Sequence, residues 1–327
     1  MTAPLLSIRD LKVHFPVRTG RVIVAKYQSL RAVDGVSFDL APGETLGIVG
    51  ESGCGKTTLG RAVLQLLPVT SGAVTWLGRE MTSLDAAAVK AARENMQIVF
   101  QDPLASLDPR MTAGDIIAEP LRNYHPELSR AEIARRVGEL MEQVGLLPGM
   151  VNRYPHEFSG GQCQRIGIAR AMILKPKLVI CDEPVSALDV SVRAQVINLL
   201  KDLQKTFGLS MLFISHDLAV VRHISDRVLV LYLGKVMELA TRESLYQAPR
   251  HPYTQALMSA VPIPDPAKER AKPRIILAGD LPSPLNPPSG CVFRTRCPNA
   301  TAVCAEKEPV RESSAPGHDV WCHHWRE

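Results

Sequence analysis

The sequence is poor in aromatic residues, which make up only 5% of its 327 residues. No basic run carries interleaved aromatics, which disfavours a nucleic-acid partner. No apolar run reaches the roughly 18 residues that a membrane-spanning helix needs. The N-terminus lacks a signal-peptide pattern, because Arg9, Asp10 and Lys12 interrupt it early. These absences predict a chain that stays in the cytoplasm and reaches a membrane only through a partner.

The composition is otherwise ordinary for a folded soluble protein, with 46% hydrophobic and 22% charged residues. The length predicts about two domains. The formal net charge of +5 could favour an acidic partner or a membrane surface, although a mixed solvated surface explains it better. In a reducing compartment the seven cysteines are expected to be thiols or metal ligands and not disulfides.

One stretch fits the phosphate-binding pattern G-x-x-x-x-G-K-[ST] at every fixed position. Its residues are Gly50, Glu51, Ser52, Gly53, Cys54, Gly55, Lys56 and Thr57. The preceding residues 44–49 predict a buried strand, and residues 57–67 have apolar residues at helical spacing. The pattern therefore stands between a strand and a helix, the context that separates a phosphate loop from a chance Gly-rich turn.

The residue types in this stretch suit a polyphosphate. Gly50, Gly53 and Gly55 let the backbone curl so that successive N–H groups point inward at an anion. The following helix adds its positive N-terminal end. Lys56 would place a cation on the β- and γ-phosphates, and the Thr57 hydroxyl would hold Mg²⁺.

Residues 5–49 alternate like β-structure, and strands are expected over residues 6–15 and 36–40. The segment 18–31 between them is basic and contains glycine, which predicts a loop. Tyr27 lies in this segment, and an aromatic shortly before a phosphate loop can stack on adenine. An ordinary loop tyrosine fits the observation equally well.

Four further candidates stand at the ends of expected strands. Gln101 could touch Mg²⁺ or the attacking water, and Asp182 could hold the water shell of Mg²⁺. Glu183 could polarise the water that attacks the γ-phosphate, and His216 could hydrogen-bond a γ-phosphate oxygen. Taken singly, solvated acids and a structural histidine explain these residues at least as well.

Residues 103–175 are expected to be mainly helical. Within them, Ser159-Gly160-Gly161-Gln162 comes just before a helix. A Ser-Gly-Gly turn at a helix N-terminus exposes N–H groups to an anion. A flexible glycine pair is the simpler explanation of this turn alone.

The order and spacing of these pieces resemble the nucleotide-binding subunit of an ABC transporter, and the match covers about residues 5–245. The departures are small. Phe158 replaces the usual leading Leu of the signature, and Cys163 follows Gln162, where a polar residue is common. The resemblance implies an α/β fold, with a P-loop NTPase (RecA-like) core and an antiparallel β subdomain. It also implies a helical signature subdomain over about residues 103–175 and a small Cys-rich C-terminal extension.

The resemblance implies a role for each candidate, and ATP and Mg²⁺ as cofactors. The implied roles are ATP binding for Tyr27, for Gly50 to Thr57, for Thr58 and for Asp182; Mg²⁺ ligation for Thr57, Gln101 and Asp182; catalysis for Glu183, His216 and Gln101; the D-loop for Ser186 to Asp189; and the signature for Ser159, Gly160, Gly161 and Gln162. Two such domains would face each other head to tail, so the signature would serve the partner's ATP. Hydrolysis would then release the dimer.

Four of the cysteines, Cys291, Cys297, Cys304 and Cys322, gather within 32 residues, with gaps of five, six and seventeen residues. Clustered thiols suggest a metal. Zinc usually takes tight C-x₂₋₄-C pairs, which are absent here, whereas iron–sulfur clusters tolerate wider spacing. The histidines His318, His323 and His324 keep a mixed zinc site open.

Residues 246–327 resemble the C-terminal region of the oligopeptide/dipeptide branch of ABC ATPases, on the stretches 251–257, 279–284 and 291–298. In that branch four cysteines can hold a 4Fe-4S cluster, which implies the same for these four cysteines, with zinc as the alternative. A structural role is expected for the cluster. The residues 13–17 and the pair Gly60-Arg61 look most like the F-type subunit, which implies a heterodimer with a D-type ATPase.

The resemblance therefore implies an ATPase that powers import of di- and oligopeptides. It would sit peripherally on the cytoplasmic face of the bacterial inner membrane, on two permease subunits, and an extracytoplasmic binding protein would deliver the substrate. Nickel, glutathione and peptide-like antibiotics are alternative substrates. A soluble mechanical ATPase that acts on DNA or ribosomes is an alternative from a different functional class. The interval 57–159 leaves no room for the long insertions of DNA-repair members, and the chain has one cassette where ribosomal members have two.

Overall fold

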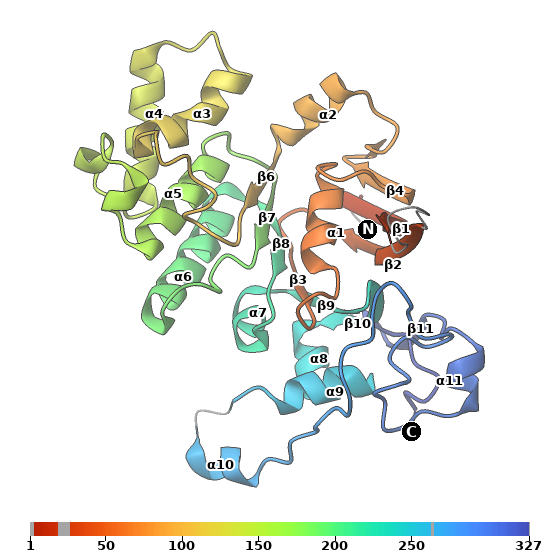
Figure 1. Cartoon of the computed structure of the whole chain (residues 1–327). Coiled ribbons are helices and arrows are strands. Elements are labelled where there is room, and N and C mark those ends of the chain that lie inside the picture. The colour runs from red at the N-terminus through yellow and green to blue at the C-terminus, as the bar shows by residue number, and fades with distance from the viewer. Residues whose placement is uncertain (1–2, 19–26, 263–264, 327) are drawn as a thin grey trace. The chain divides into compact units, whose positions relative to one another are not determined.

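The structure is a computed structural model that describes residues 3–18, 27–262 and 265–326 (Figure 1). The chain forms two compact units. Unit 1 comprises Met1–Ala41, Thr45–Ser83 and Ser215–Glu327, and unit 2 comprises Pro42–Glu44 and Leu84–Ile214. The expected mixture of strands and helices is present in both.

Unit 1 contains an antiparallel sheet of order β2-β1-β4-β5. Its strands are β1 (Leu6–Arg18), β2 (Tyr27–Leu40), β4 (Ser71–Trp76) and β5 (Arg79–Glu80). Leu6 pairs with Leu40 on one side and with Trp76 on the other, and all three side chains are buried. Alternating burial of Leu6 and Ile8 gives this sheet the apolar face that the sequence predicted.

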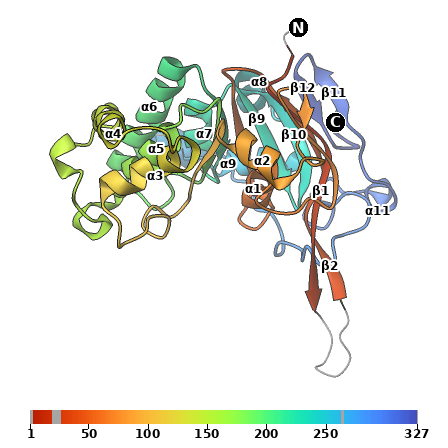
Figure 2. The same cartoon turned by 90° about the horizontal axis from the view of Figure 1, so that it is seen from above.

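A second set of strands in unit 1 follows the order β11-β12-β10-β9-β3. These are β3 (Thr45–Val49), β9 (Arg227–Tyr232), β10 (Lys235–Thr241), β11 (Glu312–Ala315) and β12 (His318–Val320). Strand β3 runs parallel to β9 and is buried along its whole length. The last two strands join the C-terminal region to β10, beside which they lie in Figure 2.

The helices of unit 1 are short. They are α1 (Lys56–Val63), α7 (Leu218–Ile224), α8 (Arg242–Gln247), α9 (Pro252–Ser259), α10 (Pro266–Ala271) and α11 (Ala302–Glu306). Helix α1 begins at the phosphate-loop lysine, and α9 begins after His251, whose Nδ1 accepts a hydrogen bond from the Tyr253 N–H at 3.0 Å. These two helices therefore start beside the residues that the sequence singled out.

Unit 2 combines three parallel strands with most of the longer helices. Its strand order is β8-β7-β6, with β6 (Met96–Val99), β7 (Leu178–Asp182) and β8 (Ser210–Ile214). Its helices are α2 (Ala86–Arg93), α3 (Ala113–Tyr124), α4 (Arg130–Gln143), η1 (Pro148–Met150), η2 (Pro155–Glu157), α5 (Gly160–Met172) and α6 (Val190–Phe207). Every residue of β7 and β8 is buried, as the continuous apolar runs predicted.

The sequence misplaced two segments. The expected loop over 18–31 is wrong for residues 27–31, which continue β2, whereas residues 19–26 lie outside the described residues. The helix expected over 57–67 ends at Val63, because Gln65 takes a left-handed φ of 55°.

Candidate functional site

The stretch Gly50–Thr57 links β3 to α1, as its pattern predicted. Gly50 and Gly55 have positive φ angles of 155° and 105°. A Cβ atom on Gly50 would lie 2.1 Å from the Leu231 carbonyl oxygen, and one on Gly55 would lie 2.1 Å from the Ala32 carbonyl oxygen. Only glycine fits at these two positions, so the turn is enclosed by neighbouring backbone.

Lys56 lies inside this turn and is only 5% exposed. Its ammonium donates hydrogen bonds to the carbonyl oxygens of Gly50 at 2.8 Å and Glu51 at 3.0 Å. The side chain thus curls back over the loop that it follows. A buried cation surrounded by backbone is suited to an anionic ligand.

Glu51 makes contacts that the sequence did not reveal. Its N–H donates to the Tyr253 hydroxyl at 2.9 Å. Its carboxylate accepts two hydrogen bonds from the guanidinium of Arg296, at 2.6 and 3.1 Å. Arg296 lies 245 residues away in the Cys-rich segment, and no local pattern links the two residues.

His216 also belongs to unit 1, where it is exposed. The N–H of the preceding Ser215 donates to the Ile48 carbonyl oxygen of β3 at 3.1 Å. The backbone before the histidine is thus bonded to the strand that leads into the phosphate loop. Tyr27 is described as the first residue of β2 and is 69% exposed. Its proposed contact with adenine stays a prediction.

In unit 2 the structure brings Gln101 and Glu183 together. The Gln101 Nε2 donates to the Glu183 Oε2 at 3.3 Å. The contact follows from the topology, because β6 and β7 are parallel neighbours and the two residues follow their carboxyl ends. Asp182, the last residue of β7, is 2% exposed. The amide of Gln101 and the carboxylates of Asp182 and Glu183 therefore lie at the same edge of the sheet.

Glu183 has a φ of 47°, in the left-handed region that non-glycine residues rarely occupy. Its N–H donates to the Ile214 carbonyl oxygen at 3.0 Å, and its carbonyl oxygen accepts from the Ser186 N–H at 3.2 Å. Such strain persists only where surrounding bonds hold it, and it clusters at functional sites. Asp189 is exposed before α6 and makes no capping hydrogen bond.

The stretch Ser159–Gln162 opens helix α5 as a capping box. The Gln162 N–H donates to the Ser159 hydroxyl at 3.3 Å, and the Ser159 N–H donates to the Gln162 Oε1 at 2.9 Å. Gly160 is exposed, and the nearest atom to a Cβ placed on it lies 3.9 Å away. The turn is therefore rigid at its ends and open at its first glycine. The uncommon Cys163 points inward and is fully buried.

The four C-terminal cysteines lie in unit 1, and their thiols act on one another electrostatically. Burial, together with the neighbouring thiols, raises the pKa of Cys291 and of Cys322 to about 11. Backbone N–H groups oppose this by bonding to the sulfurs, as His324 does to the Cys322 Sγ at 3.4 Å. Within the described ranges, no group of three or more His, Cys, Asp or Glu side chains is arranged to hold a metal ion.

Each of the three histidines of the possible mixed zinc site has at least one ring nitrogen in contact with another group. His318 is buried, with Nε2 2.6 Å from the Glu238 carboxylate and Nδ1 2.6 Å from the Ser244 hydroxyl. The Nε2 of His323 is 3.1 Å from the Lys307 carbonyl oxygen. The Nε2 of His324 is 2.8 Å from the Thr301 hydroxyl. These contacts join the end of the chain to the rest of unit 1.

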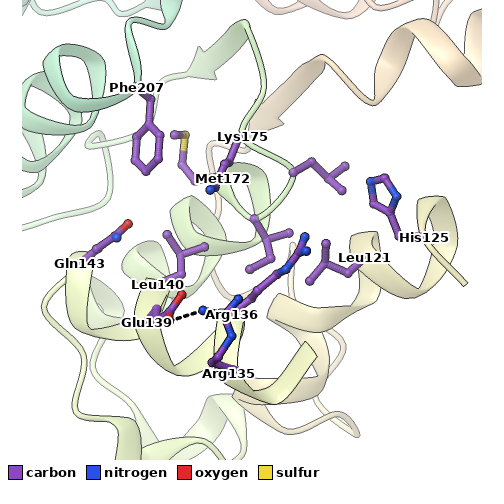
Figure 3. A pocket seen from close by; sticks show the side chains of 12 residues that line it. Leu121, His125, Arg135, Arg136, Glu139, Leu140, Gln143, Met172, Lys175 and Phe207 are labelled. Carbon is purple, nitrogen blue, oxygen red and sulfur yellow. Dashed lines mark hydrogen bonds and ion pairs between the residues drawn. The ribbon is translucent and has the colours of Figure 1, made fainter. Parts of the chain in front are cut away.

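Unit 2 also contains a cavity of about 300 Å³, shown in Figure 3. His125 follows α3, Arg135 and Arg136 belong to α4, and Lys175 follows α5. No residue that the sequence proposed for ATP or metal lines this cavity. It is separate from the candidate site.

Comparison with known proteins gives two family matches. The model described as "ABC transporter" matches residues 33–186, and the model described as "Oligopeptide/dipeptide transporter, C-terminal region" matches residues 237–304. The first match contains the phosphate loop, Gln101, the signature and Glu183. The second ends at Cys304, so it contains three of the four clustered cysteines.

Curated relatives extend over nearly the whole chain. The oligopeptide transport ATP-binding protein OppF of Escherichia coli (strain K12) is 61% identical over 97% of this chain and 95% of its own length. The oligopeptide transport ATP-binding protein AppF of Bacillus subtilis (strain 168) is 55% identical over 98% of this chain and 97% of its own. Among solved structures, a dimeric ATP-binding cassette in a post-hydrolysis state, bound to ADP and phosphate, is 27% identical. It matches 72% of this chain and 98% of its own with a TM-score of 0.65.

Proposed function

The chain belongs to the ABC transporter family, in its oligopeptide/dipeptide branch, and we propose that it is the F-type ATPase subunit that powers import of di- and oligopeptides. Its reaction is the hydrolysis of ATP to ADP and phosphate. The observation that carries the proposal is the enclosed turn Gly50–Thr57 with Lys56 buried inside it. Residues 1–245 would form the nucleotide-binding domain and residues 246–327 the C-terminal region.

The phosphates of ATP would take the place that the backbone carbonyls now hold around Lys56. The ammonium would then move from the oxygens of Gly50 and Glu51 to the β- and γ-phosphate oxygens. The next residues, Thr57 and Thr58, stand at the start of α1, where N–H groups face an anion. Ser52, Gly53 and Cys54 would complete the loop around the phosphates.

Glu183 would accept a proton from the water that attacks the γ-phosphate. Its contact with Gln101 supports this role, because the amide could help to orient that water. The strained backbone at Glu183 is consistent with a functional site. His216 would donate to a γ-phosphate oxygen. Thr57, Gln101 and Asp182 would hold Mg²⁺, whose oxygen-ligand preference their donor atoms fit. Bound Mg²⁺ neutralises phosphate charge.

The open turn Ser159–Gln162 would contact the ATP held by a second subunit, with Asp189 nearby in the D-loop. We infer a D-type ATPase as that second subunit, two permeases that dock both ATPases, and an extracytoplasmic binding protein. Among the described residues no helix combines the length and the apolar character of a membrane span. A peripheral position on the cytoplasmic face of the inner membrane therefore depends on the permeases. Tyr27 would stack on adenine from β2.

We further propose that Cys291, Cys297, Cys304 and Cys322 hold a 4Fe-4S cluster, with zinc as the alternative. A backbone N–H already bonds to one of the sulfurs, since that of His324 donates to the Cys322 Sγ at 3.4 Å. Hydrogen bonds of this kind support thiolate ligands of iron–sulfur clusters. The cluster would be structural, because ATP hydrolysis transfers no electrons.

Metal analysis of the anaerobically purified chain tests the cluster. About four irons and four sulfides per chain, with broad visible absorption, are expected. One zinc without iron would refute the cluster and leave the ATPase function intact. The variant Cys297→Ser serves as the control, since it should lose the iron and the absorption together.

Transport by the assembled complex tests the function. Vesicles that contain the two permeases and both ATPases should accumulate a labelled oligopeptide when ATP and the binding protein are supplied. The variant Glu183→Gln should still bind ATP and should lose hydrolysis at this site, because it keeps the shape of the carboxylate without its basicity. Uptake of nickel or glutathione in place of peptide would redirect the substrate assignment. Undiminished hydrolysis by the variant would refute the role of Glu183.

A further inference from the structure

Every polar group of Glu51 is engaged. Besides the bonds to Tyr253 and Arg296, its carbonyl oxygen accepts from the Lys56 ammonium at 3.0 Å and from the Cys54 N–H at 3.3 Å. Its N–H is bonded to the Tyr253 hydroxyl and cannot at the same time bond a phosphate. These bonds make Glu51 a fixed point of the loop.

Arg296 reaches Glu51 from a packed setting. Its side chain is 10% exposed, and that of Glu51 is 28% exposed. The guanidinium lies 6.0 Å from the centre of the Tyr232 ring at the end of β9. A two-pronged bond between partly buried partners differs from a surface ion pair, which contributes little because water competes with it.

The segment that carries Arg296 is anchored by Phe293, which is fully buried. The Phe293 ring centre lies 5.2 Å from that of Tyr232 and 5.3 Å from that of Tyr253. Tyr232 and Tyr253 are themselves 4.8 Å apart. Three segments distant in the sequence thus form one aromatic cluster directly behind the phosphate loop.

We propose that Arg296 is a positioning residue for ATP, acting through Glu51 to hold the phosphate loop in its binding shape. The proposal rests on the proposed role of Gly50–Thr57 in phosphate binding. It assigns the C-terminal segment a task in nucleotide binding: Phe293 fixes the segment, Arg296 clamps Glu51, and Tyr253 fixes the N–H of the same residue.

The contact between Arg296 and Glu51 should also affect ATP binding through its charge. The Glu51 carboxylate belongs to a loop that must accept a polyphosphate, and an uncompensated carboxylate there would repel ATP. Arg296 compensates that charge with two hydrogen bonds. Removal of the guanidinium would therefore both loosen the loop and expose its negative charge to the ligand.

The test measures binding of a non-hydrolysable ATP analogue with Mg²⁺ by calorimetry, on the full chain. Arg296→Met should raise the Kd about tenfold, and Arg296→Lys should recover part of the loss, since a lysine keeps the charge without the fork. Arg294→Met is the matched control. Arg294 lies in the same segment, and its guanidinium bonds the carbonyl oxygen and the hydroxyl of Ser289 and not the phosphate loop, so its variant should bind like wild type.

Neutralising Glu51 shows whether Arg296→Met weakens binding through the lost contact with Glu51 or through a general loss of folding. The double variant Glu51→Gln with Arg296→Met should bind the analogue more tightly than Arg296→Met alone, because no carboxylate is left without a partner. In the assembled transporter, Arg296→Met should raise KM for ATP with little change in kcat, as expected for a residue that does not touch the reacting atoms.

Four outcomes decide whether Arg296 positions the phosphate loop. Equal Kd values for the Met variants at 296 and 294 would overturn the clamp. A double variant as weak as Arg296→Met alone would also overturn it. Failure of Lys56→Ala to weaken binding would instead refute the phosphate loop itself, so the two failures are distinguishable. Unchanged iron in Arg296→Met would show that its effect does not come from loss of the adjacent cysteine site.

Discussion

Two glycine-rich turns precede helices in this chain, and they differ in how closed they are. At Gly50 and Gly55 in unit 1, neighbouring carbonyl oxygens leave no room for a side chain, and Lys56 is buried inside the turn. At Gly160 in unit 2, the space beside the backbone is open and the residue is exposed. A closed turn suits a ligand that one subunit holds by itself. An open turn suits a ligand that arrives on another molecule.

The largest effect on ATP binding is expected from a side chain added to the first turn. In Gly55→Ala the new Cβ would meet the Ala32 carbonyl oxygen, and the positive φ would be strained. Binding of ATP to the full chain should weaken by about a hundredfold or more. Equilibrium binding measures the loss. Gly138→Ala is the matched control, because Gly138 lies inside α4 with open space around its Cβ, and this variant should bind ATP normally.

A smaller effect, on ATP hydrolysis, is expected from a side chain added to the second turn. In Gly160→Glu a carboxylate would stand at the N-terminus of α5, in the place proposed for the partner's phosphate, without a clash in the chain itself. ATP hydrolysis by the assembled complex should fall about tenfold or more, since like charges would meet across the interface. Gly149→Ala, at another exposed glycine with open space, should hydrolyse ATP at the normal rate. A normal rate in the glutamate variant would remove the signature from the partner's site.

The sequence predicted best where a motif and its flanking elements agree. The phosphate loop, the capped helix after Ser159 and the strand ending at Asp182 were each placed within a few residues. Gln101 and Glu183 were each expected at a strand end, and the structure adds their contact, because the two strands are parallel neighbours. The family resemblance was confirmed over nearly the full length of the chain. The roles of the individual site residues stay predictions.

The contacts between distant segments could not be read from the sequence. Arg296 and Glu51 are single charges 245 residues apart, and neither stands in a periodic pattern. The continuation of β2 from Tyr27 was missed because a basic segment with glycine favours a loop, whereas pairing with β1 as far as Arg18 extends the ladder. Tertiary pairing of this kind overrides local preference.

One measurement tests the division between the two turns most directly: equilibrium binding of ATP by the free chain, with Gly55→Ala and Gly160→Glu side by side. The first variant is expected to lose binding and the second to bind like wild type, because only the closed turn would hold the chain's own nucleotide. Equal loss in both variants would contradict this expectation, and so would normal binding by Gly55→Ala.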